Sequence, residues 1–205
     1  MVKLTIDNKV VVAEEGTSIL EAAKSVGIYI PTLCYMKDIN EVGACRVCVV
    51  EIEGYDRLSA ACNTPVEEGM VVFTNSQKAR SARRINVELM LSRHFCHCPT
   101  CSRSGNCTLQ TIARDLNIYN LPYEKKFYNN VWDRSFPLIR DNNKCIKCLR
   151  CINVCDKIQT LSVWDLNHTS YRASVETRDA RDIHDINCSL CGQCITHCPV
   201  GALRE

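Results

Sequence analysis

The sequence lacks features that would define several common protein classes. No apolar run approaches the length of about 18 residues that a membrane span needs. The N-terminal stretch from Met1 to Asp7 has neither the basic region nor the apolar region of a secretory signal. There is also no G-x-G-x-x-G and no other dinucleotide fingerprint. These absences predict a cytoplasmic protein without a membrane span and without a flavin or nicotinamide site of its own.

Cysteine is the residue that the chain has in excess, with 16 in 205 residues. This fraction is near the level that marks a scaffold held together by more than its apolar core. Units below roughly 70–80 residues need disulfides, a metal or another staple. Disulfides belong to oxidising compartments, and no secretory signal is visible. We therefore expect the thiols to be metal ligands.

The formal net charge of +2 does not predict a nucleic-acid partner. Thiolate, not thiol, binds metal. Fifteen metal-bound thiolates would add negative charge that the metal only partly offsets, so the charge of the loaded protein would be negative. The basic side chains are then partly a counter-charge to the cofactors.

The cysteines fall into three blocks, which predict an α+β chain of three small cluster-binding domains at residues 1–75, 76–135 and 136–205. In the first, alternating residues around an Asp-Asn turn predict the strands Val2–Ile6 and Lys9–Ala13. Ser18 and Glu21 form a capping-box pattern, which predicts a helix from Ile19 to about Ser25 that Gly27 ends. Two further strands are expected at Val47–Ile52 and Met70–Thr74.

The second block opens with a helix after residue 75. We expect its inner face to carry Ala82, Ile85, Leu89 and Met90. Its basic residues are interpreted as a solvated face: Lys78, Arg80, Arg83 and Arg84. A second helix is expected at Leu109–Leu116, followed by a polar connector.

The third block contains the strongest motif, a run of C-x2-C-x2-C-x3-C that recurs 43 positions later. This is the spacing of bacterial two-cluster ferredoxins, in which the fourth cysteine of each run crosses to the other cluster. The motif predicts one [4Fe–4S] cluster on Cys145, Cys148, Cys151 and Cys198, and another on Cys155, Cys188, Cys191 and Cys194. Zinc is the alternative, but it takes four ligands in two pairs. Pro199 follows the second run, whereas Asp156 stands at the equivalent place in the first.

Between the runs, Thr160–Trp164 and Tyr171–Val175 are expected to form a hairpin.

The first block has the spacing C-x10-C-x2-C-x13-C, which is similar to the plant-type [2Fe–2S] ferredoxin pattern except for a longer first gap. We expect a β-grasp fold there, with a [2Fe–2S] cluster on Cys34, Cys45, Cys48 and Cys62. Gly43 lets the loop close on the cluster. A zinc site is the competing interpretation.

The middle block has the spacing H-x3-C-x2-C-x5-C and predicts a small helical domain with a [4Fe–4S] cluster on His94, Cys98, Cys101 and Cys107. A neutral imidazole in place of a thiolate should raise the potential of that cluster. Cys96 is left over, either as a buried or free thiol or as a competitor of Cys98. His97 and His197 are taken as incidental.

The order of these motifs resembles the N-terminal electron-transfer region of [FeFe]-hydrogenases and the large iron–sulfur subunit of respiratory complex I and of NAD-linked formate dehydrogenases. The resemblance covers essentially the whole chain. The double run is more similar to the hydrogenase and formate dehydrogenase branch, because the complex I subunit usually has one [4Fe–4S] cluster at that place. The chain lacks the further cysteines of a hydrogenase active site and the molybdopterin domain of a formate dehydrogenase.

The resemblance implies an electron-transfer subunit of a soluble, hetero-oligomeric NAD(P)H-dependent oxidoreductase, some of which are electron-bifurcating enzymes of anaerobes. Its partners would be a flavin- and NAD(P)-binding iron–sulfur subunit, a small [2Fe–2S] subunit, and ferredoxin or a catalytic subunit. One alternative is the truncated front part of an [FeFe]-hydrogenase. Another is a zinc-binding module for nucleic acid or protein. No catalytic site is visible in the chain itself.

Overall fold

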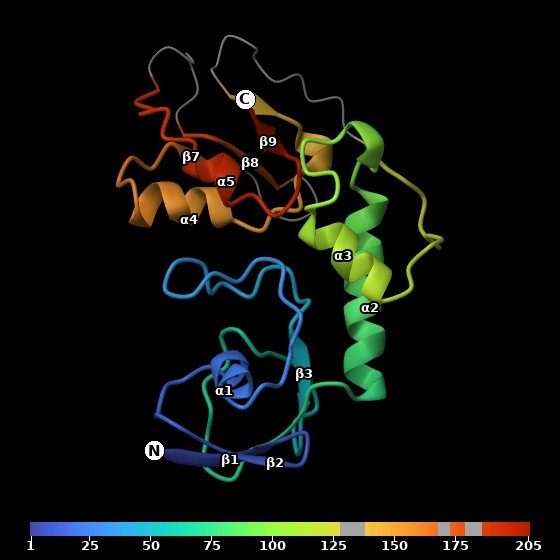
Figure 1. Cartoon of the computed structure of the whole chain (residues 1–205), viewed down its shortest axis with the longest axis vertical. Coiled ribbons are helices and arrows are strands. Elements are labelled where there is room, and N and C mark those ends of the chain that lie inside the picture. Colours follow the sequence, from blue (N-terminus) through green and yellow to red (C-terminus); the bar gives the residue numbers. More distant parts are fainter. Residues whose placement is uncertain (128–137, 168–172, 179–185) are drawn as a thin grey trace.

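The computed structural model describes residues 1–127, 138–167, 173–178 and 186–205. Figure 1 shows the N-terminal sheet at one end of the molecule and the C-terminal elements at the other, with the long helix α2 (Gln77–Ser92) running along one side. No helix in the described ranges is long and apolar enough to cross a membrane.

The N-terminal unit is a mixed five-stranded sheet in the order β2-β1-β5-β3-β4. The strand β1 pairs antiparallel with β2 and parallel with β5. The turn between β1 and β2 uses Asp7 and Asn8 at φ 45° and 67°, which suits a tight hairpin. The bounds are β1 Val2–Ile6, β2 Lys9–Ala13, β3 Val49–Ile52, β4 Ser59–Ala60 and β5 Val71–Phe73. The first two strands match the prediction, β3 and β5 are shorter than predicted, and β4 was not predicted.

The helix α1 (Ile19–Ser25) covers the sheet, as predicted. The Ser18 hydroxyl accepts a hydrogen bond from the backbone N–H of Glu21 at 3.3 Å, and Gly27 follows the helix at φ +75°. Ile19 and Ala23 are buried against Leu4, Ile6 and other strand residues in the N-terminal apolar core. The sequence-derived α+β unit is therefore confirmed for this part of the chain.

The helix α2 begins after Ser76, whose hydroxyl accepts from the N–H of Ala79 at 3.2 Å. Its buried face carries Ala79, Arg83 and Val87, four residues apart. The prediction for this helix is only partly right. Met90 packs against the second apolar core, and Lys78, Arg80 and Arg84 are exposed as expected. Ile85 and Leu89, however, are 45% and 46% exposed, and Arg83 is buried rather than solvated. The physical reason is that polar backbone of the neighbouring loop, not only apolar surface, covers this face.

The C-terminal part is built from short elements. The bounds are α3 Thr108–Asp115, β6 Ile139–Arg140, α4 Arg150–Lys157, β7 Trp164–Asn167, β8 Ser174–Thr177, α5 Gln193–Thr196 and β9 Leu203–Arg204, with 3₁₀ turns at Cys98–Thr100 and Asn142–Lys144. The strands β6 and β9 pair antiparallel, and so do β7 and β8. An antiparallel pair between the cysteine runs is present as predicted, but β7 and β8 begin three to four residues later than the predicted strands. Its turn lies outside the described residues, as does part of the predicted connector after residue 120.

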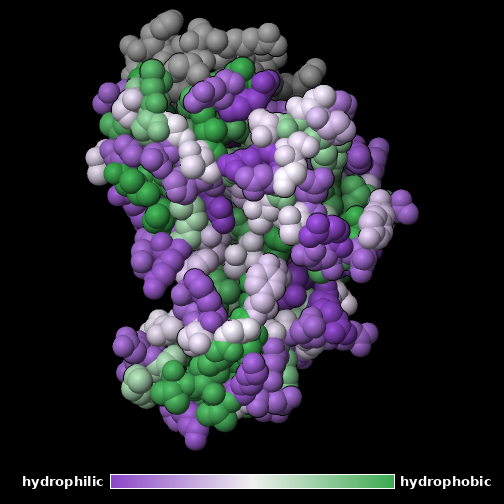
Figure 2. Space-filling view, in the orientation of Figure 1, coloured by the Kyte–Doolittle hydropathy of each residue, from purple (hydrophilic) through white to green (hydrophobic). Residues whose placement is uncertain are grey.

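A second apolar core joins parts of the chain that are far apart in sequence. It combines Val87 of α2 and Leu109 of α3 with Trp164 and Leu203, and it also includes Cys34 and Val47 from the N-terminal unit. Figure 2 shows that the visible surface is otherwise a mixture of hydrophilic and hydrophobic residues. The two ends of the molecule therefore share one core where the cysteine-bearing loops meet.

Candidate functional site

All 16 cysteines lie in the described part of the chain, and none of them forms a disulfide. They gather in four places. The thiols of Cys34, Cys45, Cys48 and Cys62 are all buried at the junction of the two ends of the molecule. The other three groups lie in the C-terminal part.

The four thiols of the N-terminal group form two hydrogen-bonded pairs, Cys34 with Cys45 and Cys48 with Cys62. Hydrogen bonding from Cys34 lowers the pKa of the Cys45 thiol to about 6, and the same bond together with burial raises the pKa of Cys34. A [2Fe–2S] cluster takes four thiolates, two on each iron. The paired thiols fit that requirement.

The loop around Cys45 and Cys48 is fixed from two sides. Gly43 has φ +63°, and a Cβ there would lie 2.9 Å from the Asn63 amide nitrogen. Arg46 is left-handed as well, at φ 53°. From α2, Arg83 donates hydrogen bonds to the carbonyls of Val47 at 2.8 Å and Val49 at 3.1 Å, on either side of Cys48. The loop geometry thus depends on a buried arginine that the sequence pattern assigned to the surface.

The middle group lies between α2 and α3 in sequence. Three of its predicted members, His94, Cys98 and Cys107, line one cavity together with Cys96 and residues of both helices. The His94 ring is buried, and burial lowers its pKa. One ring nitrogen hydrogen-bonds the Lys144 backbone, which raises that pKa, whereas Nδ1 is buried with no hydrogen-bond partner in the described ranges. Metal-ligating histidines commonly donate their second nitrogen to a carbonyl. The unpartnered Nδ1 therefore fits a metal-ligand role.

Two cysteines of this segment differ from expectation. Cys101 is absent from the lining of the cavity, and its sulfur lies against Gly201, where a Cβ would be 2.4 Å away. Cys96 is exposed, lines the cavity and has its Sγ 3.3 Å from the carbonyl of His94. Burial raises the pKa of the Cys107 thiol, and the charges of Cys101 and Cys98 add to that rise. Cys101 therefore still lies close to the group. His97 and His197 make short local hydrogen bonds, to Thr100 and to the Gln193 carbonyl.

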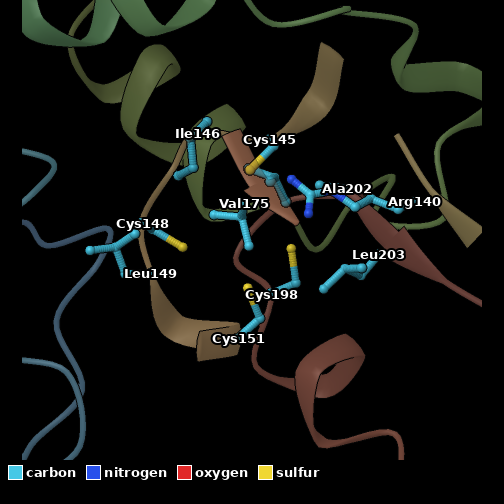
Figure 3. Close-up of a pocket in the computed structure, with 11 residues that line it drawn as sticks. Arg140, Cys145, Ile146, Cys148, Leu149, Cys151, Val175, Cys198, Ala202 and Leu203 are labelled. Carbon is cyan, nitrogen blue, oxygen red and sulfur yellow. The ribbon is translucent and has the colours of Figure 1, made fainter. Parts of the chain in front are cut away.

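The third group consists of the thiols of Cys145, Cys148, Cys151 and Cys198, which line one apolar cavity together with Ile146, Val175 and Leu203. Figure 3 shows the four sulfur atoms directed into the space between them. Burial raises the pKa of Cys148 to about 12. Binding of a metal by this thiol would therefore release a proton.

The fourth group lines a separate cavity with Cys155, Cys188, Cys191 and Cys194. Burial raises the pKa of Cys194 to about 11, and a hydrogen bond from the Trp164 side chain opposes that rise. The backbone N–H of Val163 donates to the sulfur of Cys155 at 3.3 Å. Cys155 and Cys198 are thus each placed at the cavity formed mainly by the other run.

The sequence repeat is also a repeat of backbone conformation. Lys147 and Leu190 have φ of 54° and 56°, and Leu149 and Gly192 have φ of 65° and 67°. Both pairs are separated by the repeat distance. The N–H of Lys147 lies 3.4 Å from the sulfur of Cys145, so the left-handed residue turns a donor toward the site. The departure at Asp156 has a local effect: α4 continues to Lys157, whereas Pro199 follows the short helix α5.

These groups suit clusters better than single ions. In the described part of the chain, no three histidine, cysteine, aspartate or glutamate side chains are arranged to hold one metal ion. A structural zinc needs four ligands around one centre, whereas each iron of a cubane takes one protein ligand. Buried thiols, N–H donors to sulfur and an unpartnered imidazole nitrogen therefore fit iron–sulfur clusters.

Three family models match consecutive parts of the chain, and they define it as an iron–sulfur protein. They are a 2Fe-2S iron-sulfur cluster binding domain at residues 1–77, the NADH-ubiquinone oxidoreductase-G iron-sulfur binding region at 83–121, and a 4Fe-4S dicluster domain at 144–202. These matches favour iron–sulfur sites over the zinc alternative in each part.

Its curated relatives are subunits of NAD(P)-linked enzymes. The chain is 31% identical to the NAD-reducing hydrogenase HoxS subunit gamma of Cupriavidus necator, over 100% of this chain and 87% of that protein. It therefore belongs to the family of iron–sulfur subunits of NAD(P)-linked hydrogenases and oxidoreductases. A crystal structure of NAD+-reducing [NiFe]-hydrogenase in the H2-reduced state contains a chain that matches with a TM-score of 0.90 and 28% identity, over 99% of this chain and 86% of that one.

Two further relatives are much longer than this chain. It is 43% identical to the NADP-reducing hydrogenase subunit HndD of Solidesulfovibrio fructosivorans, over 100% of this chain and 36% of that protein. It is 41% identical to the NADPH-Fe(3+) oxidoreductase subunit alpha of Geobacter sulfurreducens, over 99% of this chain and 24% of that protein. The chain thus spans about a third or less of the length of these two relatives.

Proposed function

We propose that this chain relays electrons between a flavin- and NAD(P)-binding iron–sulfur partner subunit and ferredoxin or a catalytic subunit of a multi-subunit oxidoreductase. A small [2Fe–2S] subunit would complete the assembly. The names of the relatives, which are NADP-reducing and NAD-reducing hydrogenases and an NADPH-Fe(3+) oxidoreductase, support this role. An electron-bifurcating complex of this kind would need its flavin in the partner, since this sequence has no dinucleotide fingerprint.

In this proposal the chain has the three domains delimited above and holds one [2Fe–2S] and three [4Fe–4S] clusters. Cys34, Cys45, Cys48 and Cys62 would hold the first, and His94, Cys98, Cys101 and Cys107 the second. The third would lie on Cys145, Cys148, Cys151 and Cys198, and the fourth on Cys155, Cys188, Cys191 and Cys194. The clusters would supply one-electron acceptor sites, and the protein fixes their spacing and surroundings.

The observation that carries the proposal is that neighbouring residues link the third group to each of the other three. Its link to the N-terminal group is Asn40, which is fully buried. The Asn40 amide donates to the carbonyl of Cys34 at 2.7 Å and to that of Cys148 at 3.0 Å. Arg150 adds a donor to the Cys34 carbonyl at 3.1 Å. A ligand residue of one site is therefore joined to a ligand residue of the next by one side chain.

The middle group approaches the third at two points. The imidazole of His94 hydrogen-bonds the backbone of Lys144, which precedes Cys145. The sulfur of Cys101 rests against Gly201, three residues after Cys198. Arg103 strengthens this contact by donating to the carbonyl of Thr196 at 2.7 Å.

The third and fourth groups are joined by the helix α4. Cys151 and Cys155 lie four residues apart on this helix and so share one face. The third group is therefore linked to each of the other three, and in the proposed relay electrons would pass through its cluster. We propose that the [2Fe–2S] or histidine-ligated end faces the flavin subunit and that the C-terminal clusters face ferredoxin or the catalytic partner.

Anaerobic purification with the co-expressed partner subunits would test the relay. We expect a brown complex with about fourteen iron atoms in this chain, whose clusters are reduced by NADH or NADPH. Reduction is followed by EPR, and dithionite serves as the control for full reduction. A colourless, zinc-loaded chain would contradict the cluster assignment. Clusters that respond to dithionite but never to NAD(P)H in the complex would contradict the relay. Co-purification with a hydrogenase catalytic domain on the same polypeptide would favour the truncated-hydrogenase alternative.

A further inference from the structure

Arg140 is a buried cation beside the third thiol group. It lies on β6, where it pairs with Leu203 of β9, and the N–H of Asp141 donates to the Ala202 carbonyl at 2.9 Å. The side chain is 5% exposed and lines the cavity of Cys145, Cys148, Cys151 and Cys198. Figure 3 shows its guanidinium group turned toward the sulfur atoms. The backbone pairing therefore holds a positive charge at a fixed place beside this site.

Arg140 also contacts Trp164, the first residue of β7. The guanidinium carbon lies 5.6 Å from the centroid of the indole ring, within the range of a cation–π interaction. Trp164 is 2% exposed and is held in register opposite Thr177 of β8. Both side chains are thus fixed by strand pairing and by each other.

Trp164 in turn belongs to the fourth thiol group. It lines the cavity of Cys155, Cys188, Cys191 and Cys194, and its side chain hydrogen-bonds the sulfur of Cys194. The indole has only one polar hydrogen and no acceptor, so the tryptophan is the donor. Two touching side chains, Arg140 and Trp164, therefore reach the two neighbouring cavities.

The Arg140 charge and the Trp164 hydrogen bond would both stabilise the reduced form of a cluster. Reduction adds one negative charge to a cluster, and a nearby cation or an N–H donor to sulfur stabilises that charge. Burial strengthens such interactions because the surroundings screen them poorly.

We propose that Arg140 and Trp164 are positioning residues that raise the reduction potentials of the two C-terminal clusters, Arg140 at the cluster of Cys145, Cys148, Cys151 and Cys198, and Trp164 at that of Cys194. This inference rests on the proposed function, since it needs both clusters. Neither residue is a ligand. Their contact links the effects on the two reduction potentials, because the indole face holds the guanidinium in place.

An EPR-monitored redox titration of the full, anaerobically reconstituted chain tests the inference. In R140Q we expect one [4Fe–4S] midpoint to fall. The ratio of reduced to oxidised cluster at fixed ambient potential should drop about tenfold, which is about 59 mV for one electron. R140K, which keeps the charge, should retain most of the wild-type value. In W164F, which loses the indole N–H, a different midpoint should fall.

The matched control is R204Q. Arg204 lies on β9 opposite Ile139, beside the Arg140 pair, and is exposed. Removing its charge should leave the midpoints unchanged, because water and salt screen it. An equal shift in R204Q and R140Q would overturn the inference, since only net charge would then matter.

Iron content separates the two levels of the proposal. A wild-type chain that binds no iron would contradict the proposed function itself. Full iron content with unchanged midpoints in R140Q and W164F would overturn only the tuning role. If R140Q loses iron, W164F still tests the inference, because this variant keeps the charge of Arg140. Unchanged cluster midpoints in W164F would overturn the inference, and one lowered midpoint would support it.

Discussion

His94 carries a ring nitrogen that is buried and has no hydrogen-bond partner among the described residues, while its other nitrogen meets the Lys144 backbone. A group in this state loses the stabilisation of water without a replacement. Ligation of a metal would supply it. The histidine in H-x3-C-x2-C-x5-C thus has a structural reason for its place that spacing alone could not show.

Replacing His94 with Cys should therefore keep a [4Fe–4S] cluster but lower its potential. A thiolate adds one negative charge in place of a neutral ring, and the expected shift is on the order of 100 mV. Redox-titrated EPR under anaerobic conditions measures it. His97→Cys is the control, because that ring is exposed and hydrogen-bonds Thr100. An unchanged potential in His94→Cys would show that His94 is not a ligand.

Cys96 and Cys101 make a second prediction at the residue scale. Cys96 is exposed, whereas Cys101 is half-buried and its sulfur lies against Gly201. Cys96→Ser should leave the iron content unaltered, and Cys101→Ser should lose about four irons, the content of one cubane. Iron analysis with protein quantitation gives the answer. The reverse pattern would assign the ligand role to Cys96, which lines the cavity with His94.

At the scale of elements, the loop of Cys101 and Ser102 packs against Gly201, which precedes the strand β9. A Cβ on Gly201 would lie 2.4 Å from the sulfur of Cys101 and 3.3 Å from the hydroxyl of Ser102. Gly201→Ala should therefore displace Cys101 and weaken or remove the histidine-ligated cluster, while the other signals persist in EPR. Gly105→Ala is the matched control: no atom lies within 4 Å of its Cβ. Its φ of +76° costs about 1 kcal/mol but spares the thiol. Equal loss in both variants would contradict the steric explanation.

The helix α2 makes an equally local prediction through Arg83. Its guanidinium donates to three carbonyls, those of Val47, Val49 and Thr74. Arg83→Gln should destabilise the [2Fe–2S] loop by about 2–4 kcal/mol, because charged hydrogen bonds are lost and buried acceptors stay unpaired. Denaturant titration monitored by [2Fe–2S] absorption measures the change. Arg80→Gln, at an exposed position of the same helix, should shift the midpoint little.

The elements also show what sequence could predict. Strands with strict alternation and a helix with a capping box came out correctly, because local chemistry decides them. The phase of α2 did not, since Arg83 is buried by carbonyls of a loop that precedes it by more than thirty residues. The two-residue strand β4 has no pattern of its own and exists through pairing with β3. The two C-terminal groups of thiols follow the motif spacing closely, whereas in the middle group Cys96 and not Cys101 lines the cavity. Asn40, Arg140, Trp164 and Gly201 act through long-range contacts that no local pattern encodes.

At the scale of the whole molecule, the N-terminal unit is incomplete without the rest. Leu33, Cys34 and Val47 are fully buried in the core that the C-terminal part provides. A fragment of residues 1–77 would expose them, at roughly 1.5–3 kcal/mol for each large apolar side chain. We expect this fragment to lose its [2Fe–2S] cluster to an iron chelator about tenfold faster than the full chain does, because local opening becomes easier. Bleaching of the visible absorption measures the rate. Equal rates would show that the shared core does not protect the cluster.

The exchange of Cys155 and Cys198 between the two C-terminal cavities has a consequence for biogenesis. Neither cysteine run can complete a site alone, since each supplies three thiols to one cavity and the fourth to its neighbour. If each cavity holds a cubane as proposed, the two clusters could be inserted only after both runs have folded against each other. Insertion would then be an all-or-none event for the pair, and damage to a single crossing thiol would endanger eight irons rather than four.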